Sequence, residues 1–376
     1  MISIAPIPNS ERRFRVHLTN IVGTGAVQLV ASLLPALERA RGHRLEQIYL
    51  PDRGPIAGYC RVTDGPAPTR YRRVLPNALS RVLECLVPGR RFDGPTPLLV
   101  LGDLPIRCDS PQVLFVQTLH LTQGARSGSR VGGLKYWIAR AVFRANLHRV
   151  AAFIVQTETM KAALIGTYPQ IRGKVRIVQQ PVPMWLLASG LRRADRRGGS
   201  DDALTLVYPA AAYPHKNHAL LSGVGRDADA WPVKSLMLTI PRDANPNSRV
   251  AWIDCVGMLQ PSGVIAAYGN ADALVFLSIA ESYGFPLVEA MWIGLPIVCP
   301  DLPYARSLCG DQAIYFQPDD IDSLRCALEQ LRARLSRGWW PDWSRQLAPI
   351  PNDWDAVAAA MLEILFAPNA ERQSTQ

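Results

Sequence analysis

The sequence predicts an α/β protein made of two Rossmann-like domains, each with a parallel sheet covered by helices. Short apolar runs of strand length alternate with longer amphipathic segments, the pattern of parallel sheets with helical crossovers. The length of 376 residues fits two or three domains. A charged, glycine-rich segment, residues 188–202, separates two such alternating halves. We expect an N-terminal domain over residues 1–182, a linker over 183–202, a C-terminal domain over 203–350, and a closing helix and tail over 351–376.

The composition is that of a globular protein, with 48% hydrophobic residues. No run of 18 apolar residues occurs, so no membrane-spanning helix is expected. The N-terminus has no basic start followed by an apolar stretch, so no signal peptide is expected. The seven cysteines form no C-x-x-C pair, which is typical of reduced thiols without a zinc site. These features favour a cytoplasmic protein.

The charge is divided unevenly between the two halves. Residues 1–182 hold 25 Lys and Arg against 10 Asp and Glu, a net charge of +15. Residues 183–376 hold 16 against 21, a net charge of −5. A basic half indicates an anionic partner, which can be the phosphates of a lipid-linked acceptor, an anionic membrane surface or nucleic acid. No nucleic-acid module is recognisable, so nucleic acid is not expected as a partner. A solvated arginine-rich surface without a partner is the remaining alternative.

The first domain opens with a strand, a glycine-rich turn and a helix. The strand covers residues 15–19, Gly23 and Gly25 lie in the turn, and the helix covers residues 27–39. Both glycines let a ligand approach the backbone closely. The dinucleotide fingerprint is not met, because position 28 is Gln. The turn is therefore either a weak phosphate or substrate loop or a plain tight turn.

Polar residues follow two of the further strands of this domain. Asp103 follows the strand expected at 98–101, and His120 follows the strand expected at 113–116. Since parallel strands end at one edge of a sheet, both residues are expected at the same edge. His120 is a candidate site residue, with a structural histidine as the alternative. The other expected strands cover residues 47–50, 153–156 and 175–178, and the Pro-, Gly- and Arg-rich segment 51–75 is expected to be an exposed loop.

A basic and aromatic helix is expected from Leu134 onward. Its apolar residues recur at helical spacing, and Lys135, Arg140 and Arg144 are interspersed with Tyr136 and Trp137. Such a helix can lie on a membrane surface. The alternative is a helix that packs on the core and has a solvated basic side.

The second domain restarts with a strand over residues 204–208, followed by Pro214 and by His215 and Lys216 at a helix start. A lysine at a helix N-terminus and at the C-terminal end of a strand is well placed to contact a diphosphate. A surface lysine is the alternative. Asp319 and Asp320 precede the helix at 321–335 and are expected to cap it, not to bind a metal. The other expected elements are strands at 234–240, 251–255, 274–277, 297–299 and 313–316, and helices at 262–268 and 354–366.

The stretch from residue 277 to 300 reads as strand end, loop, short helix and strand. Glu281 begins the loop, and Pro286 suits the first helical position because its missing N–H would be unpaired there. Gly294 suits the position after the helix, where a left-handed backbone is needed. The helix is therefore expected over residues 286–293.

Two carboxylates, Glu281 and Glu289, lie eight positions apart in this stretch, and both can face the C-terminal edge of a parallel sheet. Between them, the N–H groups of Gly284, Phe285 and Leu287 form a helix N-terminus that favours an anion such as phosphate. A phosphate flanked by two acceptors of hydroxyl hydrogen bonds matches the layout of a nucleotide-sugar. Two solvated glutamates in an ordinary strand–helix–strand unit are the alternative.

This stretch resembles the signature of the retaining glycosyltransferases of family 4, which have the GT-B fold. Glu281 and Glu289 enclose Gly284-Phe285-Pro286-Leu287, and Glu289-Ala290-Met291 closes the signature. The resemblance implies two Rossmann-like domains with parallel sheets facing across a cleft, the first binding the acceptor and the second the nucleotide-sugar. It is specific over residues 204–366 and rests on the order of elements over residues 1–182.

The resemblance also implies roles for individual residues. Glu281 would grip sugar hydroxyls, Glu289 would bind the ribose, and His120 would lie over the sugar. Lys216, with His215 beside it, would neutralise the leaving diphosphate. The remaining donor-binding residues would come from the central loop and the glycine turn: Ser282, Tyr283, Gly284, Phe285, Pro286, Leu287, Gly23 and Gly25.

One position departs from the family pattern. An arginine that usually stands five residues before the lysine is Ala211 here, so one phosphate clamp is absent. By resemblance, the loop over residues 256–261 lies near the nucleotide base. No metal ion and no cofactor are expected, and the nucleotide-diphosphate sugar is the donor substrate.

The sequence therefore predicts a retaining glycosyltransferase that moves a sugar from a nucleotide-diphosphate donor to a saccharide or lipid-linked saccharide. Bacterial surface-polysaccharide assembly is the expected setting, with peripheral contact to an anionic membrane through the basic first domain. The alternatives are a GT-B sugar-nucleotide epimerase or phosphorylase, and a non-catalytic nucleotide-sugar-binding protein.

Overall fold

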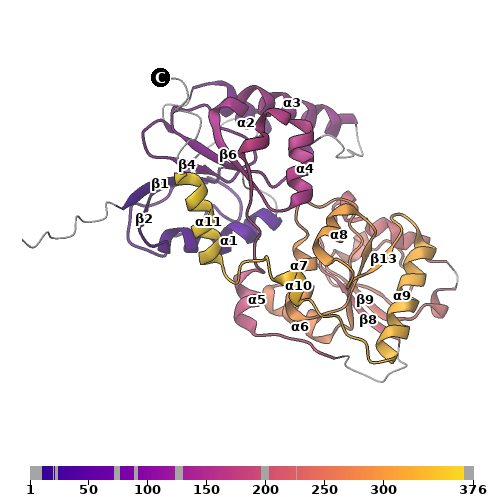
Figure 1. The fold of residues 1–376 in the computed structure, drawn as a ribbon. Helices are drawn as coiled ribbons and strands as arrows, with labels where there is room; N and C mark the ends of the chain where they lie inside the picture. Colours follow the sequence, from indigo (N-terminus) through magenta and orange to yellow (C-terminus); the bar gives the residue numbers. More distant parts are fainter. Residues whose placement is uncertain are drawn as a thin grey trace, which may run out of the picture. The chain divides into compact units, whose positions relative to one another are not determined.

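A computed structural model describes residues 11–19, 21, 24–71, 77–88, 92–122, 130–195, 203–225 and 227–367. The chain divides into two compact units, drawn in Figure 1. Unit 1 comprises residues 1–180 and 351–376, and unit 2 comprises residues 181–350. Each unit contains one parallel sheet with helices packed on it, so the expected α/β class with two Rossmann-like units is confirmed. Within the described ranges, no helix is both long enough and apolar enough to cross a bilayer.

Unit 1 contains a seven-stranded sheet in the order β3-β2-β1-β4-β5-β6-β7, and every neighbouring pair is parallel. The central strands are buried on both faces, which explains why they read as apolar runs in the sequence. The strands are β1 (Arg12–His17), β2 (His43–Pro51), β3 (Thr69–Tyr71), β4 (Leu98–Val100), β5 (Gln112–Phe115), β6 (Val150–Val155) and β7 (Val175–Ile177).

Two elements of unit 1 were not expected from the sequence. The edge strand β3 pairs with β2 inside the segment 51–75, so the expectation of a plain loop is wrong there. Thr69 and Arg70 of this strand are exposed, and no apolar run marks it, because its structure comes from pairing with its neighbour. The helix α2 (Asn77–Leu86) follows soon after it.

The helices of unit 1 pack on its sheet (Figure 1). Besides α2, they are α1 (Thr24–Arg39), α3 (Arg130–Asn146), α4 (Glu158–Thr167) and α11 (Trp354–Phe366). Side chains of α2, α3 and α4 share one hydrophobic core with Val100, Leu114 and Phe153 of the sheet. Helix α11 packs against α1 and against β5 and β6, although it follows unit 2 in the chain.

Unit 2 contains a six-stranded parallel sheet in the order β10-β9-β8-β11-β12-β13. The strands are β8 (Leu204–Tyr208), β9 (Val233–Leu238), β10 (Ile253–Cys255), β11 (Ala273–Val275), β12 (Ile297–Pro300) and β13 (Ile314–Phe316). The longer helices are α6 (Pro261–Asn270), α7 (Phe285–Ile293), α8 (Pro303–Cys309) and α9 (Ile321–Ser336). A single hydrophobic core runs through this unit and includes side chains of all six strands.

The segment 183–202, expected to be a linker, begins with a packed helix. Helix α5 (Met184–Ser189) buries Leu186 in the core of unit 2. The guanidinium of Arg193 is buried and donates hydrogen bonds to the carbonyls of Gly269 and Ala271 at the end of α6, at 2.8 Å each. One of the charged residues that suggested a linker is therefore an arginine whose guanidinium donates hydrogen bonds to the carbonyls at the end of a helix. Residues 196–202 lie outside the described ranges.

Gly294, at the end of α7, meets the backbone of this segment closely. Its φ is +86°, and a Cβ added there would lie 2.3 Å from the carbonyl oxygen of Arg193. The N–H of Arg193 donates to the carbonyl of Ile293 at 2.6 Å, so the two backbones are held together. Position 294 requires glycine for two reasons: its backbone is left-handed, and there is no space for a Cβ atom.

We predict that Gly294→Ala lowers the free energy of unfolding of unit 2 by at least about 3 kcal/mol, because backbone strain and a backbone clash add. Gly190→Ala is the matched control, since Gly190 also has a positive φ of +63° but has nothing within 4 Å of an added Cβ. It should cost about 1–2 kcal/mol, the strain alone. Chemical denaturation of both variants measures the difference, and equal losses would contradict the close contact with Arg193.

Candidate active site

The candidate site lies at the C-terminal edge of the sheet of unit 2. Strands β8 and β11 are neighbours in this sheet, but the chain proceeds outward from β8 to β9 and from β11 to β12. The loops that leave β8 and β11 therefore diverge, which is the topological switch point where open α/β sheets bind ligands. The first loop leads to the 3₁₀ helix η5 (Pro214–Lys216), and the second leads to α7.

An ion pair joins these two loops. The Nζ of Lys216 lies 2.5 Å from the Oε1 of Glu281, and the two side chains are only 14% and 10% exposed. The ammonium of Lys216 also lies over the ring of Phe276, 5.7 Å from its centroid. The structure thus brings together two residues that the sequence placed separately in the site, 65 positions apart. A cation and a carboxylate oxygen are available at one point of the sheet edge.

Backbone hydrogen bonds hold the same two loops in register. The carbonyl of His215 accepts a hydrogen bond from the N–H of Ile279 at 2.9 Å and from the hydroxyl of Ser278 at 3.1 Å. Tyr208, at the end of β8, donates its hydroxyl to the carbonyl of Lys216 at 2.8 Å. The position of the ammonium group is therefore determined by the backbone as well as by its ion pair.

The surroundings of His215 favour its neutral form. Burial lowers the pKa of His215, and the positive charge of Lys216 lowers it further, against the opposing charge of Glu281. Its ring lies parallel to that of Tyr213, with centroids 5.7 Å apart. His215 can therefore contribute a hydrogen bond beside Lys216 but not a second positive charge.

Glu289 occupies a different environment from Glu281. It lies on the first turns of α7 with 5% of its surface exposed, and its Oε2 accepts a hydrogen bond of 2.7 Å from the hydroxyl of Tyr268 on α6. Burial raises the pKa of Glu289 to about 7, against the opposing effects of the Tyr268 hydrogen bond and the charge of Lys216. The sequence suggested a carboxylate facing the sheet edge, whereas the structure shows one that packs against a phenol.

The N-terminus of α7 offers fewer amide donors than the sequence suggested. Gly284 precedes the helix with a φ of +89°, and Pro286 occupies the first turn. The N–H of Leu287 donates to the carbonyl of Gly284 at 2.9 Å, and the Leu287 side chain is fully buried. Leu287 was expected to be an anion donor, and this is wrong because its N–H already closes a turn. The expected set narrows to the amides of Gly284 and Phe285.

The other loop residues expected to bind a donor surround this helix start. Ser282, Phe285 and Pro286 are half-buried, while Tyr283 is buried. The rings of Tyr283 and Phe285 meet edge to face, with centroids 5.0 Å apart. The buried ring of Tyr283 therefore packs against Phe285 within the loop.

The candidates of unit 1 lie after β5 and in α1. His120 lies in the 3₁₀ helix η2 (Leu119–Leu121), and its ring stacks on Tyr136 of α3 with centroids 3.8 Å apart. The Oδ1 of Asp103 accepts from the amides of Gln117 and Thr118, so Asp103 shapes the loop that carries His120. Loss of hydration raises the pKa of Asp103. Gly25 is exposed in the first turn of α1, and Gly23 lies outside the described residues.

Sequence reasoning missed three tyrosines that organise the site. Tyr208 and Tyr268 hold Lys216 and Glu289, as described above. Tyr304 of α8 donates its hydroxyl to the carbonyl of Ser278. All three rings are buried, and a buried tyrosine needs a partner for its hydroxyl. A tyrosine inside an otherwise apolar strand or helix was the available signal.

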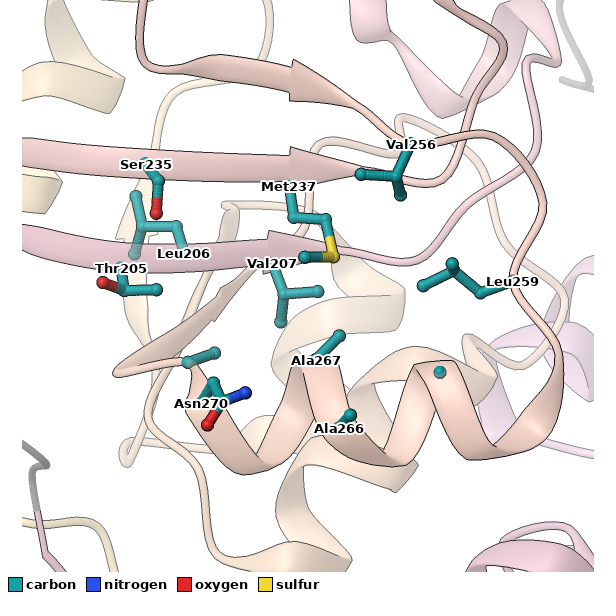
Figure 2. A pocket seen from close by; sticks show the side chains of 12 residues that line it. Thr205, Leu206, Val207, Ser235, Met237, Val256, Leu259, Ala266, Ala267 and Asn270 are labelled. Carbon is teal, nitrogen blue, oxygen red and sulfur yellow. The ribbon is translucent and has the colours of Figure 1, made fainter.

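A cavity of about 190 Å³ lies elsewhere in unit 2, between β8, β9 and α6 (Figure 2). Val207 and Met237 point from the strands toward α6, where Ala266 and Ala267 are too small to fill the space. Val256 and Leu259 of the loop expected near the nucleotide base line it, but none of the residues expected to bind the diphosphate or the sugar does, and its walls are mostly apolar. We interpret it as a packing gap under α6, not as the candidate site.

Comparisons with known proteins show similarity to glycosyltransferases in part of unit 2. Residues 253–333 match the family model described as "Glycosyl transferases group 1", a range that contains Glu281, Glu289 and the start of α7. Over 215 residues the chain is 38% identical to the O-antigen chain mannosyltransferase RfbU of Salmonella typhimurium, which covers 53% of this chain and 56% of RfbU. The chain spans 22% and 56% of the length of two curated relatives, the O-antigen chain mannosyltransferase B of Escherichia coli and RfbU.

The fold is shared with solved structures at low identity. Sucrose-phosphate synthase from Thermosynechococcus elongatus has a TM-score of 0.65 at 14% identity, over 94% of this chain and 98% of that one. Anabaena HepE, solved with UDP and glucose, has a TM-score of 0.62 at 13% identity, over 95% of this chain and all of that one. WaaG, a glycosyltransferase involved in lipopolysaccharide biosynthesis, has a TM-score of 0.63 at 14% identity, over 94% and 99%. The α/β fold with two Rossmann-like parallel-sheet units, which these proteins share, is therefore confirmed.

The burial of Glu289 leads to a pH-dependent stability. Its pKa is raised from 4.5 to about 7 in the folded chain, so the folded state binds more protons between these values. The stability contributed by protonated Glu289 is complete below about pH 4.5 and is lost as the pH rises through 7. We predict that Glu289→Gln gains about 3 kcal/mol of unfolding free energy relative to the wild type between pH 4.5 and 8, as measured by denaturation.

Two further variants make this prediction specific. Tyr268→Phe removes the hydrogen bond that lowers the pKa of Glu289, so the loss of stability should extend to higher pH. Glu363→Gln is the control, because Glu363 is exposed on α11. Its stability difference from the wild type should stay constant over the same range. A constant difference for Glu289→Gln as well would show that Glu289 ionises freely.

Proposed function

We propose that this chain is a retaining glycosyltransferase that takes a sugar from a nucleotide-diphosphate donor and transfers it to a saccharide or lipid-linked saccharide. The observation that carries the proposal is the Lys216–Glu281 pair beside the N-terminus of α7, at the switch point of the sheet. A lysine and helix amides favour a diphosphate, and a carboxylate accepts hydrogen bonds from sugar hydroxyls. Glu281 and the helix start also lie within the segment that matches the glycosyltransferase model.

The proposed reaction needs negative charge to be stabilised on the leaving diphosphate. The bond between the anomeric carbon and the phosphate oxygen breaks, and its electron pair remains on the phosphate. The acceptor hydroxyl forms the new bond on the same face and gives its proton to the departing phosphate oxygen. Lys216 and the amides of Gly284 and Phe285 stabilise the developing charge, and Glu281 orients the sugar through its hydroxyls.

Glu281 can serve the sugar because Lys216 occupies only one of its oxygen atoms in the ion pair. A carboxylate offers about four lone-pair positions, so sugar hydroxyls can donate to the remaining ones. Glu289 would contact the ribose, and a partly protonated carboxyl with a raised pKa can both donate and accept there. In this proposal His215 assists Lys216 with a hydrogen bond.

The sugar and the setting are proposed from the relatives. RfbU is described as an O-antigen chain mannosyltransferase, so mannose is the first sugar to test and surface-polysaccharide assembly is the setting we propose. A non-catalytic nucleotide-sugar-binding protein is the second candidate. The observation that favours it is Ala211, exposed at the position where the family usually has an arginine for the diphosphate.

Binding is tested first, by thermal shift with UDP, GDP, ADP and dTDP. A nucleotide at about 100 times its Kd should stabilise the chain by about 2.7 kcal/mol through mass action. Turnover is then tested with the corresponding mannose, glucose, galactose and N-acetylglucosamine donors, with and without a lipid-linked saccharide. Binding without turnover would support the binding protein, and no binding by any nucleotide would reject both candidates.

We predict that Lys216→Ala lowers kcat by about 10²–10³-fold while the nucleotide still binds, because the charge matters most in the transition state. Lys234→Ala is the matched control, since Lys234 is an exposed lysine on β9 of the same unit and should leave kcat unchanged. The double variant with Lys216→Ala and Glu281→Ala leaves no half-buried unpaired carboxylate. Comparing its stability with that of Lys216→Ala shows whether the single variant loses kcat through lost folding or through lost catalysis. If Lys216→Ala behaves like Lys234→Ala, the assigned role of Lys216 is wrong.

A further inference from the structure

Helix α2 presents an apolar face away from the core. Leu79, Leu83, Leu86 and Val87 are 37–54% exposed and lie at positions i, i+4, i+7 and i+8, which is one side of a helix. The opposite side carries Cys85, which is buried in the core of unit 1. The outward side of α2 is thus apolar, unlike the polar outward side of an ordinary surface helix.

Helix α3 repeats this arrangement beside α2. Leu134, Trp137 and Ile138 are 37–62% exposed, at positions i, i+3 and i+4. Val142 and Phe143 of the same helix are buried in the core that α2 also contacts. Figure 1 shows α2 and α3 side by side on unit 1, and residues of the two helices are in contact.

Because both helices turn their inward sides to one core, their outward sides form one surface, which we call the α2/α3 patch. It consists of Leu79, Leu83, Leu86, Val87, Leu134, Trp137 and Ile138. These are seven of the eleven large apolar side chains that are exposed among the described residues. Such a concentration differs from scattered surface leucines and indicates an interaction surface.

Basic groups accompany the patch. Lys135 and Arg144 are exposed on α3, and Arg140 is half-buried there. Arg107 donates a hydrogen bond to the carbonyl of Leu86, which places a guanidinium at the end of α2. Helix α3 contains no acidic residue, and the one acid of α2, Glu84, is half-buried. Apolar side chains within a positively charged rim are complementary to a bilayer surface with anionic lipids.

We propose that the α2/α3 patch docks unit 1 on an anionic membrane surface, with its leucines and Trp137 among the lipid headgroups and its basic residues on the lipid phosphates. A second copy of the chain fits less well, because two positively charged rims would face each other. The proposal rests on the proposed function in one respect only: a lipid-linked acceptor would place the reaction at such a surface. The proposal combines the two alternatives that the sequence left open for the helix after Leu134. This helix packs on the core, and its outward side is basic and apolar.

Sedimentation of the full chain with phosphatidylcholine vesicles, with and without phosphatidylglycerol, tests the docking without any nucleotide or sugar. The chain should bind the vesicles that contain phosphatidylglycerol. Binding should weaken strongly at about 1 M salt, where the Debye length falls to about 3 Å. Equal binding to both vesicle types, or binding to neither, would overturn the proposal.

Substitutions locate the surface. Leu83→Ser with Trp137→Ser should weaken vesicle binding by at least about tenfold, because both helices lose a lipid-facing side chain. Lys135→Ser should weaken it by about fivefold. Val62→Ser is the matched control, since Val62 is 56% exposed in the loop between β2 and β3 of the same unit, and it should bind as the wild type does.

Three readouts separate the remaining explanations. Thermal unfolding of the variants should be unchanged, because the substituted side chains are exposed, so lost binding is not lost folding. Light scattering should show that the wild type does not self-associate through the patch. If the wild type self-associates and Leu83→Ser with Trp137→Ser abolishes this, the patch is an interface between copies and the proposal fails. Vesicle binding without donor turnover would support the docking proposal and reject the proposed function. Donor turnover without vesicle binding would support the proposed function and reject the docking proposal.

Discussion

The ion pair between Lys216 and Glu281 is the interaction on which the site of unit 2 depends. It joins the side chains of the loops after β8 and β11, which diverge from neighbouring strands. The N–H of Ile279 donates to the carbonyl of His215, and the hydroxyl of Tyr208 donates to the carbonyl of Lys216, so the ammonium keeps its position before any ligand arrives. Positioned charge of this kind stabilises a developing anion without reorganising at the moment of reaction. Placing two ions where they have little hydration costs free energy, and their attraction across the short contact acts against this cost.

The two glutamates of the same loop and helix solve the problem of a poorly hydrated carboxylate in different ways. Glu281 has a cation within 2.5 Å, whereas Glu289 has a neutral phenol at 2.7 Å and a more distant positive charge. Desolvation therefore dominates for Glu289 and raises its pKa. Two identical residues eight positions apart thus lie in different electrostatic surroundings. Pairs of acids whose environments differ in this way are common in catalytic sites.

Much of the fold was predictable, because it depends on patterns that are local in sequence. Buried parallel strands read as apolar runs, and Pro286 and Gly294 marked the ends of α7. Features that depend on distant neighbours could not be read in this way. The edge strand β3 has no apolar run of its own, the Lys216–Glu281 contact joins residues 65 positions apart, and Arg193 looks like a linker residue until the end of α6 is beside it. The amide of Leu287 was assigned wrongly because a turn within Gly284–Leu287 uses it.

Helix α11 has a consequence for the order in which the chain can acquire its structure during translation. It buries Trp354, Val357, Met361 and Leu362 and packs on α1, β5 and β6, yet the whole of unit 2 is synthesised before it. While the ribosome makes residues 181–350, the nascent first unit lacks this helix and exposes apolar surface of its sheet. Unit 2 has all its strands and can fold first, although it comes later in the chain. The first unit therefore passes through a long interval in which it is most prone to aggregate and most in need of a chaperone.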